Sequence, residues 1–353
     1  MPLSQATLNR TTLQRQLLLE RADLTALEAI ERLVAVQGQE ANPPYVGLWS
    51  RLNGFAHDDL TSLLYGRQVV RGTLLRATQH LSSAADYRWL RSLAQAPMSR
   101  TRKGAFGKAT RDVDLGELTA LTRRHLTGRT LTRPRLRDLL AERWPGVEPL
   151  ALAASAQFLV PIVHTPPNGT WNQGGATPFT LAEEWLGHPL EADPPLDRLV
   201  TRYLAAFGPA SVMDIQAWSG LTRLKAVAER MDLRTYLDES GRVLYDLPGA
   251  PLVAADTPAP VRFLPWFDNL IVAYADRRRM LTDERRRQVC VGAAVYPTFL
   301  VDGAVAGMWD IADGTLVMRP FAPLPDGTRA ELEEEGARLL AFCGFPAARV
   351  RWP

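Results

Sequence analysis

The sequence has little cysteine and no long apolar run, and each shortage excludes a class of protein. Its two cysteines, Cys290 and Cys343, give neither a disulfide framework nor a zinc-binding spacing. The longest apolar stretch, 150–163, is interrupted by Ser155 and Gln157 and is too short to span a bilayer. The N-terminal residues are too charged to form the apolar core of a signal peptide. We therefore expect a soluble protein of the cytoplasm that has no membrane partner.

Common catalytic motifs are also missing. The chain has no Gly-x-Ser-x-Gly nucleophile elbow, no Gly-x-x-x-x-Gly-Lys phosphate loop and no His-Glu-x-x-His zinc motif. Its five histidines are scattered, so we expect surface or packed side chains and no metal site. These absences argue against elbow-type hydrolases, P-loop enzymes and zinc proteases, and no metal or cofactor is expected.

Lysine is nearly absent, and arginine carries the positive charge. Lysine and arginine total 41 against 38 acidic residues, a net charge of +3, but lysine occupies only three positions. Genomic base composition explains the arginine bias equally well, so the distribution of charge is more informative. The segment 100–137, the basic zone, contains eleven bases and three acids, a local net charge of +8. A basic zone on a mildly acidic body predicts a face that binds a polyanion such as nucleic acid.

The apolar spacing predicts an α+β protein whose first third is helical. The second helical run, 27–34, is expected to end near Gly38, because glycine commonly follows a helix and Pro43-Pro44 prevents continuation. Two later segments are each predicted to form three helices and a two-stranded hairpin, at 115–126, 134–143, 149–158 and 159–180, and at 196–207, 211–218, 222–231 and 236–247. This is the winged-helix order, although three-helix units also occur in proteins that do not bind DNA.

From residue 260 onward the pattern changes to short strands. Hairpin turns are expected at Asp302-Gly303 and Asp313-Gly314. Candidate strands lie at 261–263, 270–274, 297–301, 305–311 and 316–320, and a helix follows at 329–342. We predict a small meander sheet or barrel that this helix closes.

The string Gln37-Gly38-Gln39 lies at the expected end of the second helix. Within a continuous helix, side chains two residues apart point about 200° apart and could not serve one site. If Gly38 breaks the helix, the local backbone is extended or left-handed and the two amides can converge. The alternative is a solvated helix end that carries two polar side chains, and the spacing alone favours it.

Several longer strings resemble the winged-helix DNA glycosylases typified by AlkZ and YcaQ. They are Leu8-Asn-Arg, Gln16-Leu-Leu-Leu-Glu-Arg, Glu31-Arg-Leu-Val-Ala-Val-Gln-Gly-Gln, Pro43-Pro-Tyr-Val-Gly-Leu-Trp-Ser-Arg-Leu, Arg71-Gly-Thr-Leu-Leu-Arg-Ala-Thr-Gln-His-Leu, Pro166-Pro-Asn-Gly-Thr-Trp, Leu264-Pro-Trp-Phe-Asp-Asn-Leu and Leu300-Val-Asp-Gly-Ala-Val-Ala-Gly-Met-Trp. They run over essentially the whole chain in the family's order. The resemblance implies tandem winged-helix domains at 1–100, 101–190 and 191–254, and a C-terminal β-barrel with a terminal helix at 255–353. Together these domains are expected to form a C-shaped DNA-binding channel.

The family's catalytic signature is a glutamine, an aliphatic residue, and then glutamine or aspartate. Gln37 and Gln39 match its polar ends in the Gln/Gln form of AlkZ, whereas Gly38 departs from the aliphatic middle. The resemblance implies a monofunctional DNA glycosylase that excises N7-alkylguanine, and it extends the expected substrates to interstrand crosslinks. Alkylation at N7 makes the base cationic, so the remaining task is to position water at C1′. The expected enzyme is a monomer without cofactor, acting on double-stranded DNA with alkylated bases in the bacterial nucleoid.

Candidate DNA contacts follow from the same resemblance and from the basic zone. Arg71, Arg76 and His80 are expected to reach phosphate or the lesion, with a strand-edge ion pair as the alternative. The other candidates belong to the basic zone and to an arginine tract that a solvated loop would also explain: Arg133, Arg135, Arg277, Arg278 and Arg279. The competing hypothesis is a non-catalytic winged-helix DNA-binding protein, such as a transcription regulator. A regulator usually requires a symmetric dimer, and no dimerisation helix is evident in the sequence.

Overall fold

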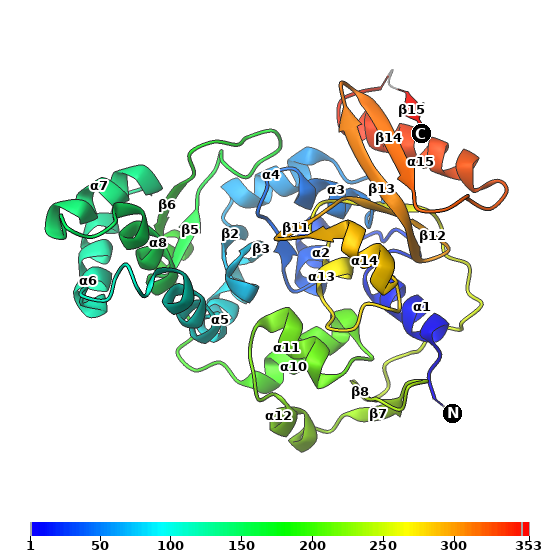
Figure 1. Cartoon of the computed structure of the whole chain (residues 1–353), viewed down its shortest axis with the longest axis horizontal. Helices are drawn as coiled ribbons and strands as arrows, with labels where there is room; N and C mark the ends of the chain where they lie inside the picture. Colours follow the sequence, from blue (N-terminus) through cyan, green and yellow to red (C-terminus); the bar gives the residue numbers. More distant parts are fainter. Residues whose placement is uncertain (1, 347–348, 353) are drawn as a thin grey trace.

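The computed structural model describes residues 2–346 and 349–352, and its first part places helices around three short strands (Figure 1). Side-chain caps fix the first two helix starts, because Ser4 Oγ accepts from the Thr7 N–H at 3.1 Å and Thr25 forms a capping box with Glu28. The elements are α1 (Gln5–Arg15), α2 (Ala26–Arg32), β1 (Val36–Gln37), α3 (Pro43–Trp49), α4 (His57–Tyr65), β2 (Val69–Thr73), η1 (Leu75–Ala77), β3 (Gln79–Ser83) and α5 (Ala84–Phe106).

The middle of the chain contains three helices followed by a hairpin. Its elements are α6 (Leu115–Leu126), β4 (Leu131–Thr132), α7 (Arg133–Arg143), α8 (Pro149–Leu159), β5 (Ile162–His164), β6 (Pro178–Leu181) and α9 (Ala182–Leu186). Leu118, Leu140 and Leu152, one from each of the three helices, share a core with Phe179 of the hairpin. The three helices lie where the apolar spacing predicted them, and α6 has the predicted bounds.

Strands from these two parts join in one six-stranded sheet, in the order β1-β3-β2-β5-β6-β4. The junction is the antiparallel pair β2–β5, in which Arg71 is the partner of His164. A Cβ on Gly72 would lie 2.7 Å from the Tyr87 ring and 3.1 Å from the Ile162 carbonyl oxygen. Glycine is therefore required where β2 approaches α5 and β5. The sheet therefore contains strands from both sides of the domain boundary that the sequence predicts near residue 100.

The third part again has three helices and a hairpin. Its elements are α10 (Leu196–Phe207), α11 (Val212–Ser219), α12 (Lys225–Arg230), β7 (Arg234–Leu237) and β8 (Val243–Asp246). The rings of Tyr203 and Phe207 pack on Trp218 of α11, with centroids 5.2 and 5.8 Å away, inside the largest core cluster. α11 starts at a capping box of Ser211 and Asp214. The predicted helices are again present: α10 has its predicted bounds, and the boundaries of α11 and α12 are shifted by one to three residues.

The C-terminal part is an open sheet, which corrects the expectation of a closed barrel. Its elements are β9 (Arg262–Leu264), α13 (Asn269–Val272), α14 (Asp283–Val289), β10 (Cys290–Val291), β11 (Ala294–Val295), β12 (Thr298–Val301), β13 (Ala304–Ala312), β14 (Thr315–Pro320), α15 (Thr328–Phe342) and β15 (Val350–Arg351). The main sheet has the order β15-β14-β13-β12-β9, and within the described residues its two edge strands do not pair. Leu332 and Leu339 of α15 pack with Phe263 and Phe299. The helix thereby covers the apolar face that closure would otherwise bury.

The predicted strand at 270–274 is also wrong, because this segment forms α13. The Asp268 carboxylate caps the helix by accepting from the Leu270 N–H, and it also pairs with Arg51 through two contacts of 2.8 Å. A second buried pair joins Arg15 and Asp246 at 2.6 and 2.8 Å. Such bidentate pairs have specific geometry, and removing one partner leaves an uncompensated buried charge. They tie the first part of the chain to the third and to the C-terminal part.

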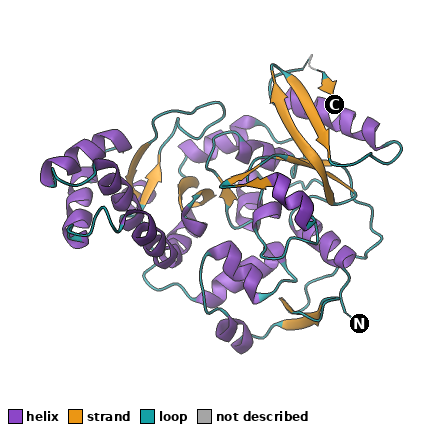
Figure 2. Cartoon of the chain, in the orientation of Figure 1, coloured by secondary structure: helices purple, strands orange, loops and turns teal. Residues whose placement is uncertain are grey.

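The parts surround the β1–β3 region. In Figure 1, α6–α8 lie at the left, α10–α12 below, and the open sheet with α15 at the upper right. Figure 2 shows that helices predominate in the left and lower parts, whereas the upper right part is a sheet with one helix packed against it. No helix in the described ranges has the length and apolar character needed to cross a membrane.

Candidate active site

The two candidate glutamines lie on an extended segment rather than at a helix end. α2 ends at Arg32, and Val34 then adopts the left-handed conformation with a φ of +69°. The chain continues into β1, where Gln37 is the partner of His80 on β3. The expected helix end near Gly38 is therefore wrong. The break falls several residues earlier, at a β-branched residue that rarely adopts this conformation.

Gly38 continues the extended path, since its N–H donates to the Gln79 carbonyl at 2.9 Å and its φ is not left-handed. Side chains two residues apart on extended backbone lie on the same side, which is the arrangement that a shared role of Gln37 and Gln39 requires. β1 itself ends at Gln37, and the chain bends at Gln39. The Gln37 Oε1 lies 3.4 Å from Arg76 Nη2, and the Gln39 Oε1 lies 3.4 Å from the Gln79 backbone nitrogen. Both contacts are long for hydrogen bonds, so both amides keep capacity to bind water.

Arg71 holds the backbone of this segment from beneath. Its Nε donates to the Gly38 carbonyl at 2.7 Å, its Nη2 to the Gln39 carbonyl at 2.9 Å, and its Nη1 to Asn168 Oδ1 at 2.5 Å. The side chain is buried, so its guanidinium serves protein acceptors rather than the expected phosphate. Arg71 is better described as a residue that positions the two glutamines.

The turn that contains Asn168 is shaped around this guanidinium. Gly169 has a φ of +87°, and a Cβ there would lie 2.9 Å from the Arg71 Cδ. Glycine meets both the conformational and the steric requirement. Burial lowers the pKa of Arg71 to about 10, and the nearby Glu40 carboxylate opposes that shift. Arg71 therefore remains protonated at neutral pH.

Two histidines beside this segment are buried and neutral. Burial, aided by the charges of Arg76 and Arg71 respectively, lowers the pKa of His80 and of His164 to about 3. The His80 Nδ1 lies 3.0 Å from the Thr78 carbonyl, so Nδ1 carries the proton, and Nε2 has no partner in the described structure. His80 is only 1% exposed, so the expected contact of this side chain with DNA is not supported.

Gln39 lines a cavity of about 330 Å³ that opens between the first and middle parts of the chain. Its lining is polar and basic: Gln39, Arg71, Gln79, Arg133, Pro134, Gln157, His164, Gly175, Ala176 and Thr177. Arg133 stands at the start of α7, and its Nε donates to Gln157 Oε1 at 2.9 Å. The fold therefore brings a candidate catalytic amide and a candidate phosphate contact to one cavity.

Residues 30–342 match the family model for AlkZ-like DNA glycosylases. The chain belongs to the AlkZ-like DNA glycosylase family. An interstrand DNA cross-link repair glycosylase from Streptomyces sahachiroi is 26% identical over 368 residues, and the match covers 96% of each chain. The solved structure of Streptomyces sahachiroi DNA glycosylase AlkZ has a TM-score of 0.83 at 21% identity and covers 100% of both chains, so the fold is shared. Membership in this family identifies an enzyme and removes the regulator hypothesis.

Only some of the predicted DNA contacts are free on the glycosylase. Arg133 and Arg135 are exposed at the start of α7, and Arg135 makes no hydrogen bond within the described residues. Arg76 donates to the Trp218 carbonyl at 2.6 Å, and burial lowers its pKa to about 10. Its remaining long contact is with Gln37, so Arg76 orients that amide more readily than it reaches a phosphate.

The three arginines at 277–279 of the glycosylase also differ in whether their side chains can reach DNA. Arg278 is exposed and pairs with Asp276 at 2.7 Å, so it can exchange this partner for a phosphate. Arg277 donates to the Cys290 sulfur at 3.2 Å. Arg279 is buried, where it donates to Thr12 and Pro209 and lies over the Tyr274 ring. The predicted DNA contact by Arg279 is therefore not supported, because its charge is used inside the core.

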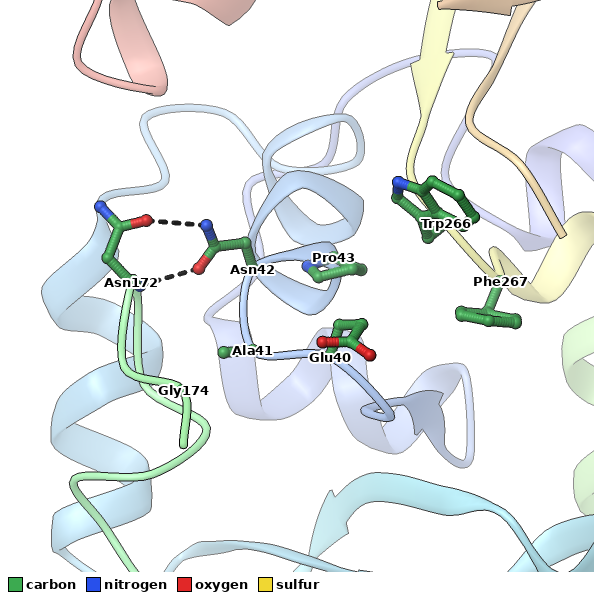
Figure 3. A pocket seen from close by; sticks show the side chains of 8 residues that line it. All are labelled: Glu40, Ala41, Asn42, Pro43, Asn172, Gly174, Trp266 and Phe267. Carbon is green, nitrogen blue, oxygen red and sulfur yellow. Dashed lines mark hydrogen bonds between the residues drawn. The ribbon is translucent and has the colours of Figure 1, made fainter. Parts of the chain in front are cut away.

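A larger cavity of about 630 Å³ begins at Glu40, the residue that follows the Gln37-Gly38-Gln39 segment of the glycosylase. Figure 3 shows the Glu40 carboxyl group between a pair of asparagines and two aromatic rings. Asn42 and Asn172 form that pair, with the Asn42 Nδ2 donating to Asn172 Oδ1 at 2.8 Å and the Asn172 N–H donating to Asn42 Oδ1 at 2.8 Å. The rings belong to Trp266 and Phe267.

Several of these residues carry little signal in the sequence. Asn168 belongs to the Pro-Pro-Asn-Gly string, and nothing in the sequence relates it to Arg71, which lies 97 positions earlier. His164 is one of the scattered histidines. Glu40 and Trp266 had no signal beyond their places next to the Gln37-Gly38-Gln39 segment and in the Leu264-Pro-Trp-Phe string. No cluster of three or more His, Cys, Asp or Glu side chains suited to a metal ion occurs in the described part of the chain.

Proposed function

We propose that this glycosylase excises N7-alkylguanine from double-stranded DNA by attack of water at C1′, with Gln37 and Gln39 orienting the water. The observation that supports the proposal is that Gln37 ends a strand and the Gly38 N–H continues its ladder to Gln79, a path on which the two neutral amides can serve one water. An amide oxygen accepts a hydrogen bond from water but cannot take its proton at neutral pH. Such a site positions a nucleophile and supplies no strong acid or base.

An N7-alkylated guanine does not need an acid to leave. The N9–C1′ bond breaks with its electron pair moving to the cationic base, which departs as neutral 7-alkylguanine. Water adds to C1′ of the oxocarbenium-like sugar and loses a proton to solvent, and an abasic site remains. The neighbouring Glu40 lines a different cavity from Gln39, and His80 and His164 are neutral. Interstrand crosslinks through N7 are proposed as substrates because the 26%-identical relative is named for their repair.

We further propose that the repeated helix and hairpin units, at 1–100, 101–190 and 191–254, act as winged-helix domains that line a DNA-binding channel. The exposed arginines at the start of α7 and Arg278 would contact its phosphates. A monomer acting on the bacterial chromosome in the cytoplasm is sufficient for this chemistry, because every proposed catalytic residue comes from one chain.

The test is a duplex carrying one N7-methylguanine, incubated with enzyme and then treated with alkali to cleave abasic sites. Excision is expected at the lesion, while uracil and 1,N6-ethenoadenine, which are neutral leaving groups, are left intact. Gln39→Ala should lower the single-turnover rate by about 10²-fold, the scale of losing a positioned water, with DNA affinity little changed. Undiminished excision by the Gln37→Ala, Gln39→Ala double variant would remove both residues from the mechanism. Efficient uracil excision would show that a general acid operates.

A further inference from the structure

One buried side chain in the cavity that Gln39 lines, the Gln39 cavity, has an unused hydrogen-bond donor. Gln157, near the end of α8, is only 9% exposed, and its Nε2 has no partner in the described structure. Its Oε1 accepts from Arg133 Nε at 2.9 Å, and this contact fixes which end of the amide is the donor. A buried donor without an acceptor is costly, so the Gln157 amide indicates a ligand that accepts hydrogen bonds.

The first turn of α7 faces the same cavity. Arg133 and Pro134 begin this 11-residue helix, and both line the cavity. The side chain of the N-cap residue, Thr132, makes no capping hydrogen bond, and the first turn contains no acidic residue. The N–H groups of a first turn have no partner within their own helix, and they carry the positive end of the helix dipole. The Gln157 amide and the start of α7 therefore both offer donors to one space.

The charge of the cavity is positive. Arg71 and Arg133 line it, and no acidic side chain is among its described lining residues. The Arg71 guanidinium donates to Gly38, Gln39 and Asn168, whereas the two terminal nitrogens of Arg133 make no hydrogen bond within residues 2–346 and 349–352. Burial, together with the charges of Arg71 and Arg133, lowers the pKa of His164 in the same wall to about 3. The positive charge of the cavity thus lacks a counterion on the protein.

These properties indicate the chemistry of the occupant. It must accept several hydrogen bonds and carry negative charge, and a volume of about 330 Å³ is too large for a single bridging water. A DNA phosphodiester meets these requirements, because arginines, neutral amides and helix N-termini are its usual partners on proteins. The phosphate and C1′ of a nucleotide are joined through one sugar. A phosphate bound in this cavity would therefore fix where C1′ lies relative to Gln39.

We propose that the Gln39 cavity is a subsite for one backbone phosphate beside the damaged nucleotide, held by Gln157 Nε2, the Arg133 guanidinium and the first turn of α7. This inference rests on the proposed role of Gln39 in orienting water, and it adds how the sugar is placed against that residue. Gln157 is thereby assigned to substrate binding and not to the chemical step.

The experiment uses a duplex with one 2′-fluoro N7-methylguanine nucleotide, which resists cleavage. A single uncharged methylphosphonate linkage replaces each phosphate in turn on both sides of the lesion, and the dissociation constant is measured for every duplex. In the wild type, one linkage should weaken binding by about tenfold or more, the scale of a hydrogen bond to a charged group. In Gln157→Leu, the penalty at that linkage should fall to about threefold or less, because the amide no longer donates to the phosphate. Gln157→Glu keeps an acceptor for Arg133 but repels the phosphate, so the uncharged linkage should carry no penalty in that variant.

Gln14→Leu is the matched control. Gln14 is an exposed glutamine of α1 that does not line the cavity, so this variant should retain the wild-type penalty at the same linkage. An equal penalty in the wild type and in both Gln157 variants would overturn the inference, and so would a scan in which no linkage stands out. Either result would show that the Gln157 amide does not hold a phosphate.

The scan measures binding to an uncleaved duplex, so its outcome is independent of the excision assay. If the wild-type enzyme leaves N7-methylguanine in place on an ordinary duplex, the proposed function fails and the scan still decides on the subsite. Normal excision together with a scan that overturns the subsite would leave the proposed function intact.

Discussion

Removing the Arg71 guanidinium should disable catalysis without weakening DNA binding. Arg71→Met keeps an unbranched side chain in the space but deletes the donors to the Gly38 carbonyl, the Gln39 carbonyl and Asn168 Oδ1. Hydrogen bonds from a charged donor contribute roughly 1.5–3 kcal/mol each. Gly38 is buried and loses its partner outright, whereas Gln39 is exposed and water can replace its donor.

The expected cost is therefore that of about two lost bonds, on the order of 3 kcal/mol. If this cost is expressed as disorder of the catalytic segment, single-turnover excision falls by about 10²-fold, because each 1.36 kcal/mol corresponds to a tenfold change in rate. The single-turnover rate of Arg71→Lys should lie between those of wild type and Arg71→Met, because one ammonium group cannot reproduce the planar guanidinium that reaches three acceptors.

The assay measures excision of N7-methylguanine over a range of enzyme concentrations, together with the melting temperature. The rate at saturation should fall in Arg71→Met, and the half-saturating concentration should stay within about twofold of wild type. Arg135→Met is the matched control, because that arginine is exposed and should change affinity and not the saturated rate. The reverse pattern for Arg71, with weaker binding and a normal saturated rate, would refute its positioning role and restore the phosphate contact.

Three further predictions concern charge, packing and pH. Neutralising Arg133, Arg135 and Arg137 of α7 should lower the slope of log affinity against log salt by about 1.8, or about 0.9 for each of two phosphate contacts, because Arg137 already pairs with Asp138. An unchanged slope would show that these three arginines do not contact the DNA. Gly38→Ala should keep excision activity within about threefold of wild type, because the new Cβ lies 3.3 Å from the Leu81 side chain and a small shift of that side chain accommodates it. A loss of activity as large as that of Gln39→Ala would show that glycine is required at this position. The melting temperature should be constant from pH 8 to 7 and fall as the pH drops below 6.5, because unfolded His80 and His164 take up protons that their folded pKa of about 3 refuses. Replacing both by glutamine should flatten this dependence between pH 7 and 5.5, and an unchanged dependence would contradict their neutral burial.

Much of the helical framework could be predicted from apolar spacing and caps, because these are local properties. α6 has its predicted bounds, and the predicted strand ranges anticipate the hairpins β12–β13 and β13–β14 with their Asp-Gly turns. The closed barrel was wrong because closure depends on whether two edge strands meet. α15 lies far along the chain from β9 and packs against its Phe263, a tertiary contact that apolar spacing alone does not predict.

The candidate site was predictable only in part. The Gln37-Gly38-Gln39 string stands out in the sequence, and its catalytic role stays a prediction. The helix end expected near Gly38 was wrong, because α2 ends at Arg32 and Val34 turns the chain. Propensity gives no reason to expect a valine in the left-handed region. The burial of Arg71 depends on Asn168, which belongs to a different part of the chain. A single sequence carries no signal for such a contact, so a buried arginine was interpreted as a phosphate contact.

The six-stranded sheet has a mechanical consequence. One of its edges is β1, which ends at Gln37, and the other is β4, which is followed directly by Arg133. The first and middle parts of the chain therefore share a continuous ladder of backbone hydrogen bonds, and no hinge separates them at the β2–β5 junction. Opening the Gln39 cavity by rotating one part away from the other would break that ladder. Under the proposed mechanism, a damaged nucleotide would reach the glutamines by deformation of the DNA, against a protein frame that keeps its shape.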